Sequence, residues 1–84
     1  MKQQKSEISV DQPIVYEIEI QGRLEERWSR WFDDMDITVK NQPSGPTVTI
    51  LRGEVVDQAA LHGLLNRIRD LGIPLLSVHL MNAD

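Results

Sequence analysis

Residues 57–81 read DQAALHGLLNRIRDLGIPLLSVHLM, and within this stretch the spacing of apolar residues changes from helical to strand-like. Over 57–72 the apolar side chains recur every three or four positions, which predicts an amphipathic helix. Asp57 suits the N-cap of that helix, because its carboxylate can accept a hydrogen bond from a backbone N–H of the first turn. Gly72 suits the position just after the last turn, and Pro74 prevents the helix from continuing.

The nine residues that follow, 73–81, predict a strand, because apolar and polar side chains alternate along them. Alternation assigns the side chains to two faces, with Leu76, Val78 and Leu80 on one and Ser77, His79 and Met81 on the other. A helix that leads directly into a strand is half of a strand–helix–strand unit, so we expect a preceding strand.

The upstream sequence supplies the remaining elements. IVYEIEI (14–20) alternates apolar residues with glutamate, which predicts a strand with one solvated face. RLEERWSRWFDD (23–34) has an apolar stripe at helical spacing. DITVK (36–40) and TVTILRGEV (47–55) predict two further strands, separated by the turn residues NQPSGP.

The resulting order is strand, helix, strand, strand, helix, strand. It predicts an α+β fold of the ferredoxin-like (βαββαβ) class, a plait with a four-stranded antiparallel sheet and two helices on one face. In the third strand we expect Val48 and Ile50 to point towards the helices. Thr47, Thr49 and Leu51 are then expected on the open face. A swapped or intertwined dimer of the same elements is the competing arrangement.

Length and composition favour one small domain of ordinary globular character. We expect residues 1–13 to be a flexible N-terminal tail and residues 14–82 to form the single folded domain. The chain has no cysteine, which excludes disulfides, thiolate metal sites, iron–sulfur clusters and thiol nucleophiles. A domain this small gains stability from oligomerisation, because a second copy extends its core.

Charge and hydropathy exclude further classes of partner. The net charge of −4 disfavours nucleic acid, whose phosphates an acidic surface repels. The expected open face also lacks the aromatic residues on which RNA bases stack. We expect no membrane partner, since no 18-residue window is apolar, and the polar first residues do not form a secretory signal. The expected compartment is the cytoplasm.

Two groups of polar residues are candidates for a catalytic or metal site. Asp33, Asp34 and Asp36 lack the glycine and distal glutamate of a calcium-binding loop, so we interpret them as a solvated cluster and leave weak cation binding open. Ser77 and His79 have the residue types of a hydrolytic triad but no recognisable oxyanion hole. We therefore expect neither catalytic residues nor a metal or other cofactor.

His62 and Gly63 stand in the middle of the helix predicted over 57–72, where glycine costs about 0.5–1 kcal/mol relative to alanine. We expect Gly63 to let an indole ring of Trp28 or Trp31 approach the helix backbone. A neighbouring subunit's helix, or a tolerated glycine, are the alternatives. His62 has no second histidine at metal-binding spacing, so we interpret it as a half-exposed polar residue.

The segment VVDQAALHGLLNRIRDLGIPLLSV (55–78) resembles the C-terminal half of a group of small uncharacterised bacterial proteins. Those proteins also carry a YEI-type first strand followed by a short helix that contains tryptophan, as Tyr16–Phe32 does here. The resemblance covers most of residues 14–80, and its distinctive part is DQAALHGLL. It implies a free-standing bacterial domain and assigns no functional residue.

These observations favour a non-catalytic protein-interaction or regulatory module, which we expect to self-associate as a homodimer or to bind a protein partner. Its candidate interface is the open sheet face together with the flank of the second helix. The residues concerned are His62, Gly63, Thr47, Thr49, Leu51, His79 and Met81.

Two other functions stay open. The first is a domain that senses a small ligand at a dimer interface, with the Gly72–Pro74 loop or the Gly22–Arg23 turn in contact with the effector. The second is a small hydrolase that uses His79, Glu17 or Arg23, which we rank below both of the other functions.

Overall fold

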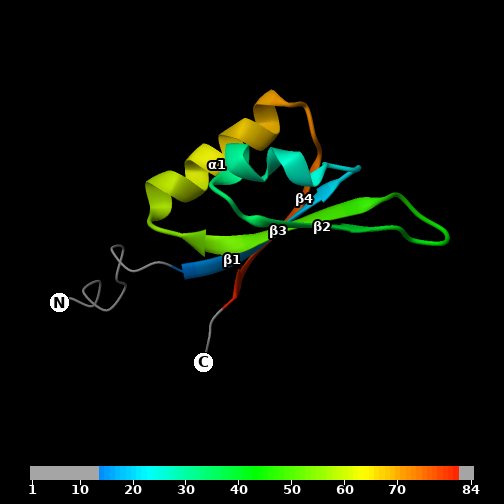
Figure 1. Cartoon of the computed structure of the whole chain (residues 1–84), viewed down its shortest axis with the longest axis horizontal. Coiled ribbons are helices and arrows are strands. Elements are labelled where there is room, and N and C mark those ends of the chain that lie inside the picture. Colours follow the sequence, from blue (N-terminus) through cyan, green and yellow to red (C-terminus); the bar gives the residue numbers. More distant parts are fainter. Residues whose placement is uncertain (1–13, 82–84) are drawn as a thin grey trace.

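Six elements follow one another along the chain in the predicted order, in a computed structural model that describes residues 14–81 (Figure 1). They are the strand β1 (Ile14–Gln21), the 3-10 helix η2 (Glu26–Phe32), the strands β2 (Asp36–Lys40) and β3 (Val48–Val55), the α-helix α1 (Gln58–Asp70) and the strand β4 (Leu75–Met81). The expected tail, residues 1–13, and the last expected domain residue, Asn82, lie outside the described residues.

The four strands form one antiparallel sheet in the order β2-β3-β1-β4, and both helices lie on the same side of it (Figure 1). The prediction of an α+β fold with a four-stranded antiparallel sheet and two helices is confirmed at this level. β1 lies between β3 and β4, so both halves of the chain are joined through it.

The alternation along β1 defines the two faces of the sheet. Tyr16, Ile18 and Ile20 are buried towards the helices, whereas Glu17 and Glu19 point to the opposite, open face. Burial of every second residue is what a period of two requires when one face is covered. The covered side continues into the helix layer, which contributes a further set of buried side chains: Leu24, Phe32, Met35, Leu61, Leu64 and Ile68.

The side chains of β3 that point towards the helices are not the ones predicted to do so. Ile18 of β1 pairs with Leu51, and Ile20 pairs with Thr49. Paired residues in an antiparallel sheet share a face, so Thr49 and Leu51 point towards the helices, where both are fully buried. Val48 and Ile50 point to the open face instead. The prediction for β3 was wrong because a strand that is apolar on both faces does not reveal which face is covered.

The buried hydroxyl of Thr49 ties the first connection to the sheet. It donates to the Gly22 carbonyl at 2.6 Å and accepts from the Leu24 amide at 3.0 Å. Gly22 has a φ of 108°, a left-handed conformation that suits glycine at the point where the chain leaves β1. Thr49 therefore holds the chain in place between the end of β1 and the start of η2.

The helix predicted over 23–34 is a 3-10 helix and covers fewer residues. Leu24, before this helix, and Phe32, its last residue, are both buried in the core. A 3-10 helix advances about 2.0 Å per residue, against about 1.5 Å in an α-helix. The extended geometry lets few residues reach between these buried residues. Residues three apart eclipse in such a helix, and the rings of Trp28 and Trp31 accordingly lie 5.4 Å apart.

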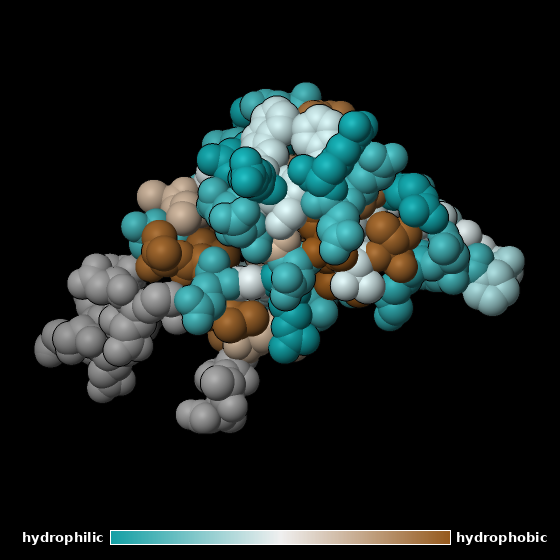
Figure 2. Space-filling model, viewed as in Figure 1, coloured by the Kyte–Doolittle hydropathy of each residue, from teal (hydrophilic) through white to brown (hydrophobic). Residues whose placement is uncertain are grey.

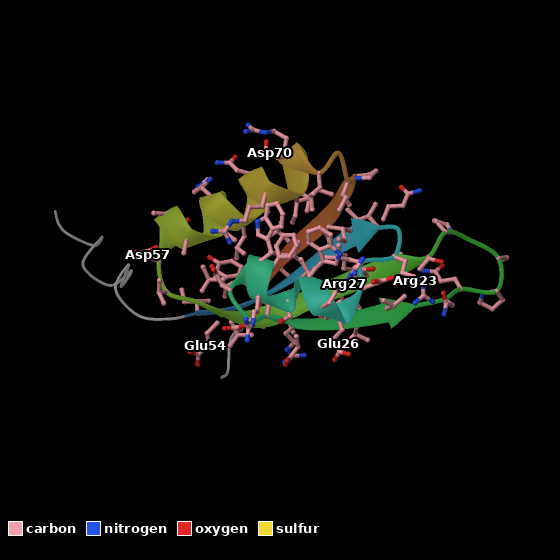
Figure 3. All side chains as sticks on the ribbon, turned by 45° about the horizontal axis from the view of Figure 1, so that its top comes forward. Arg23, Glu26, Arg27, Glu54, Asp57 and Asp70 are labelled. Atoms are coloured by element: carbon pink, nitrogen blue, oxygen red, sulfur yellow. The ribbon has the colours of Figure 1, made fainter. Side chains whose placement is uncertain are left out.

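The second predicted helix is confirmed with its caps. The Asp57 carboxylate accepts a hydrogen bond from the Ala60 amide at 2.8 Å, as expected of an N-cap. Gly72, just beyond the helix, has a φ of 72° and ends it in the left-handed conformation. Asp57 and Asp70 mark the two ends of α1 in Figure 3.

Replacing Thr49 with valine is expected to lower the free energy of unfolding by about 2–3 kcal/mol, because it leaves the Gly22 carbonyl and the Leu24 amide without their partner. Thr49→Ser keeps the hydroxyl and is expected to cost only about 1 kcal/mol for the lost methyl group. Urea denaturation measures both. A valine variant as stable as the parent protein would show that this hydroxyl does not hold the connection.

Candidate functional site

The open face of the sheet carries rows of side chains that cross the strands. Asp36, Arg52, Glu17 and His79 are successive register partners on β2, β3, β1 and β4, so acidic and basic residue types alternate along this row. Opposite charges on neighbouring strands stabilise a sheet modestly, by about 0.2–1 kcal/mol per pair. The row therefore places opposite residue types side by side on the open face of the sheet.

The candidate interface residues are divided between the two sides of the sheet and the helix. His79 and Met81 lie on the open face, where alternation predicted them, and His79 is exposed. Thr49 and Leu51 are buried under the helices, so the prediction that they lie on the open face was wrong. Thr47 precedes β3 and lies in the turn region, where its hydroxyl donates to the side-chain amide oxygen (Oδ1) of Asn41 at 3.4 Å.

His62 is exposed on α1, and Gly63 beside it is not a site of close approach. A Cβ added at Gly63 would have no described atom within 4 Å. The expectation that Gly63 makes room for a tryptophan ring is therefore wrong. Gly53 of β3 is the glycine at a close approach, since a Cβ there would stand 3.3 Å from the Met35 Cα atom. A glycine inside a strand was the available signal for it.

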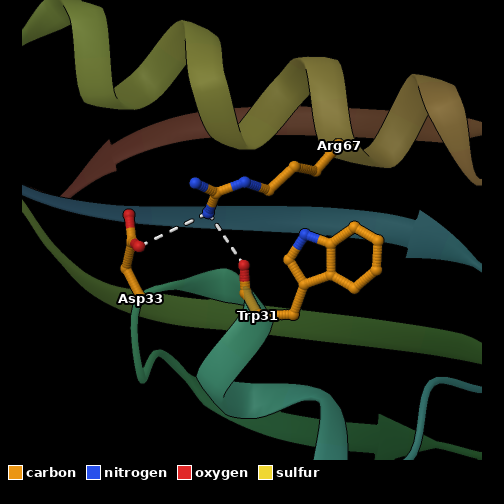
Figure 4. A network of polar contacts seen from close by, with 3 residues as sticks. All are labelled: Trp31, Asp33 and Arg67. Atoms are coloured by element: carbon orange, nitrogen blue, oxygen red, sulfur yellow. Dashed lines mark hydrogen bonds and ion pairs between the residues drawn. The ribbon is translucent and has the colours of Figure 1, made fainter.

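The two helices are joined by one polar network on their outer side. The Arg67 guanidinium donates to the Trp31 carbonyl at 2.8 Å and to the Asp33 carboxylate at 3.3 Å (Figure 4). Asp33 and Asp34 both have positive φ, near 60°, and form the turn that ends η2. This network gives Asp33 a structural role in joining α1 to the turn.

The three predicted carboxylates do not converge on a metal site. Asp33 binds Arg67, Asp34 continues the turn and Asp36 begins β2 opposite Arg52. Within residues 14–81, no group of three or more histidine, aspartate or glutamate side chains is close enough to hold a metal ion.

The residues considered for hydrolysis share one face without forming a connected triad. Glu17 is the register partner of His79, and Glu19 that of Ser77. The Ser77 hydroxyl oxygen is buried and has no hydrogen-bond partner among the described residues. A nucleophile needs a general base within hydrogen-bonding reach, and this arrangement does not supply one for Ser77. Arg23 lies in the turn that follows β1.

Apolar side chains on β4 form the surface that sequence reasoning missed. Among large apolar residues, Leu75, Leu76, Val78 and Leu80 are all exposed, by 37% to 54%. Val78 and Leu80 pair with Ile18 and Tyr16, so they lie on the helix side of the sheet, beyond the cover of the helices. We call these four residues the β4 patch. The signal in the sequence was a strand of apolar residues without a single charge.

Outside the β4 patch, the exposed large apolar residues in the described part of the chain are Trp31 and Val56. The charged residues Arg23, Glu26, Arg27 and Glu54, labelled in Figure 3, are exposed. In the view of Figure 2, hydrophilic side chains cover most of the helix layer, and apolar ones appear beneath it, over the sheet. None of the helices in the described part of the chain is long and apolar enough to cross a membrane.

The fold and the exposed patch define a small α+β domain with one apolar sheet edge. The chain matches the family described as Domain of unknown function (DUF8691) over residues 15–79. This match spans more than half of the chain, so the protein belongs to that family. Membership agrees with the resemblance to an uncharacterised group. No curated protein and no solved structure matches the chain.

Alanine substitutions at Gly63 and Gly53 are expected to change the free energy of unfolding in opposite directions. Gly63→Ala is expected to raise the free energy of unfolding by about 0.5–1 kcal/mol, because the helix gains propensity and the new methyl group meets open space. Gly53→Ala is expected to lower it by about 1–3 kcal/mol, because the methyl group would press on the backbone at Met35. Urea denaturation at low protein concentration measures both, and equal effects would contradict this assignment of the close approach.

Proposed function

We propose that this protein is a non-catalytic protein-interaction or regulatory module that works as a homodimer. The observation that carries the proposal is the β4 patch, in which every large aliphatic side chain of the strand is exposed. A small domain gains stability by covering such a surface, and contiguous exposed apolar residues are typical of interaction sites. We place it in the bacterial cytoplasm, the compartment expected from the sequence.

We also propose that the fold is a ferredoxin-like plait whose first helix is shortened to a 3-10 helix. The strand order β2-β3-β1-β4, with β1 antiparallel to both neighbours, supports this assignment. Each strand–helix–strand unit in such a plait skips one strand of the sheet, as the units β1-η2-β2 and β3-α1-β4 do here.

The interaction module is expected to self-associate in sedimentation velocity between about 1 and 100 µM, a range that spans ordinary micromolar binding. The sedimentation coefficient should rise from that of a monomer to that of a dimer across this range. The measurement uses the intact chain at moderate ionic strength. A monomer throughout would contradict the homodimer and, with it, the proposed use of the β4 patch for self-association.

A second function has one specific observation in its favour. The Gln21 amide donates to the Pro74 carbonyl at 3.0 Å, which brings the Gly22–Arg23 turn beside the Gly72–Pro74 loop at one end of the sheet. The sequence names one or the other of these segments as the contact for a small ligand, and the two lie side by side. We therefore keep a ligand-sensing domain as the alternative function.

A ligand-sensing domain is expected to melt at a higher temperature with its effector present, because binding to the folded state alone stabilises it by mass action. The measurement is a thermal-shift screen of amino acids and nucleotides, repeated with Arg23→Ala to test the turn. A melting temperature that none of these compounds raises would count against this alternative.

A further inference from the structure

The two edges of the sheet differ in how they are protected from pairing with another strand. β2, at one edge, begins and ends with charged residues, Asp36 and Lys40. β4, at the other edge, reads LLSVHLM and contains no lysine, arginine, aspartate, glutamate or proline. Charges and proline on an edge strand are the usual means of preventing edge-to-edge association. β4 has neither, and within residues 14–81 no strand pairs with its outer edge.

The hydrogen bonds of β1 show which backbone groups of β4 point outward. The Gln21 amide bonds to Pro74 and the Gly22 amide to Thr47, so odd-numbered residues of β1 direct their amides towards β4. Their register partners on β4, including Ser77 and His79, direct N–H and C=O groups back to β1. Alternation therefore turns the N–H and C=O groups of Val78 away from the sheet, towards its outer edge.

The regular part of this edge is short and centred on one residue. The register between β1 and β4 shifts between Glu19 and Ile20, so the strand is irregular around Leu75 and Leu76. Residues 77–81 pair without interruption, and His79 is the middle residue of this run. Val78 and Leu80, on either side of it, have outward-pointing backbone groups and exposed apolar side chains.

We propose that β4 of a second copy of this chain pairs antiparallel with β4, about a two-fold axis that passes between the two His79 residues. The two sheets then join into one sheet of eight strands, with both helix layers on the same side. This inference rests on the proposed function as a homodimer and specifies the surface that forms it.

The sequence of β4 is complementary to itself in this register. Val78 of one copy stands opposite Leu80 of the other, and both hydrogen-bond through their outward backbone groups. Their side chains, which the helices leave exposed, meet on the helix side of the joined sheet. On the open face Ser77 stands opposite Met81 of the other copy, and His79 opposite His79. Apolar residues thus meet apolar residues on the side that continues the core.

The charges near the edge do not oppose this contact. Glu17 is the register partner of His79, so in the joined sheet two histidines separate the Glu17 carboxylates of the two copies. No lysine, arginine, aspartate or glutamate lies on β4 itself. Like charges directly opposite one another would destabilise the pairing, and this register avoids them among the paired β4 residues.

The exposed area of the β4 patch limits the affinity expected of the proposed dimer. The exposed parts of the β4 patch amount to roughly 300 Å² per copy, whereas a standard interface buries about 800 Å² on each partner. Backbone groups of the edge and the side chains of Ser77, His79 and Met81 must contribute the rest. We therefore expect a dimer of micromolar rather than nanomolar affinity.

Single-cysteine variants test the register directly, because the natural chain has no cysteine. His79 is part of a non-hydrogen-bonded pair in the proposed dimer, where Cα atoms lie about 4.5 Å apart, within the range that a disulfide spans. Under mild oxidation His79→Cys is expected to form a covalent dimer within minutes. Thr38→Cys, exposed on the same face of the other edge strand, is the matched control and is expected to remain monomeric on denaturing gels.

A charge on the edge provides the second test. Leu80 is 54% exposed, so Leu80→Lys is compatible with the folded monomer, and its circular dichroism and melting transition are expected to resemble those of the parent. The dissociation constant of its dimer, measured by sedimentation velocity, should be at least tenfold higher than that of the parent. The reason is that the lysine ammonium would be buried against Val78 of the second copy. Thr38→Lys is the matched control and should leave dimerisation unchanged.

The outcomes separate this inference from the proposed function. A native dimer in which His79→Cys fails to cross-link, or in which Leu80→Lys has no effect, would overturn the β4 pairing and leave the homodimer standing. A chain that stays monomeric at 100 µM and does not cross-link would overturn both, and the edge would then belong to residues 1–13 or to a different protein.

Discussion

The hydroxyl of Thr49 is the interaction on which the arrangement of this domain depends. It sits at the end of the β1–β3 pairing, fully buried, and bonds to both sides of the connection that leads from β1 to η2. Because the group is buried, its two hydrogen bonds are made without competition from water. The same residue therefore joins β3 to the segment that leads from β1 to the helix side of the sheet.

That arrangement also determines which surface stays uncovered. With β1 central, the helix layer packs over the middle of the sheet, where Ile18, Ile20 and Leu51 are fully buried. The 3-10 helix is short and keeps its own rings, Trp28 and Trp31, partly in solvent. β4 lies at the margin of this cover, so Val78 and Leu80 face the helix side without being buried by it.

Much of this fold could be predicted from local chemistry. Asp57 and Gly72 delimit α1 because a capping carboxylate and a left-handed glycine act on their immediate neighbours. The face of β3 could not be predicted, since Val48 and Thr49 both suit a strand and the covered face is chosen by pairing with β1. Helical spacing likewise predicted a helix before β2 but could not reveal that this segment forms a 3-10 helix. The exposure of the β4 patch depends on the order of the strands in the sheet. The spacing of residues along a single strand does not reveal that order.

The contrast between the two edges argues that the composition of β4 serves a purpose. Charged residues make up 26% of the chain, and β2 has one at each end, yet β4 has none. Exposed leucine and valine on an edge strand promote association with any complementary strand, which is a hazard unless a defined partner covers them. In the proposed dimer, an antiparallel copy of β4 matches Val78 and Leu80 in backbone direction and in side-chain character. A sheet edge that is apolar, uncharged and complementary to itself is what a two-fold interface requires, because each side of such an interface must bind its own image.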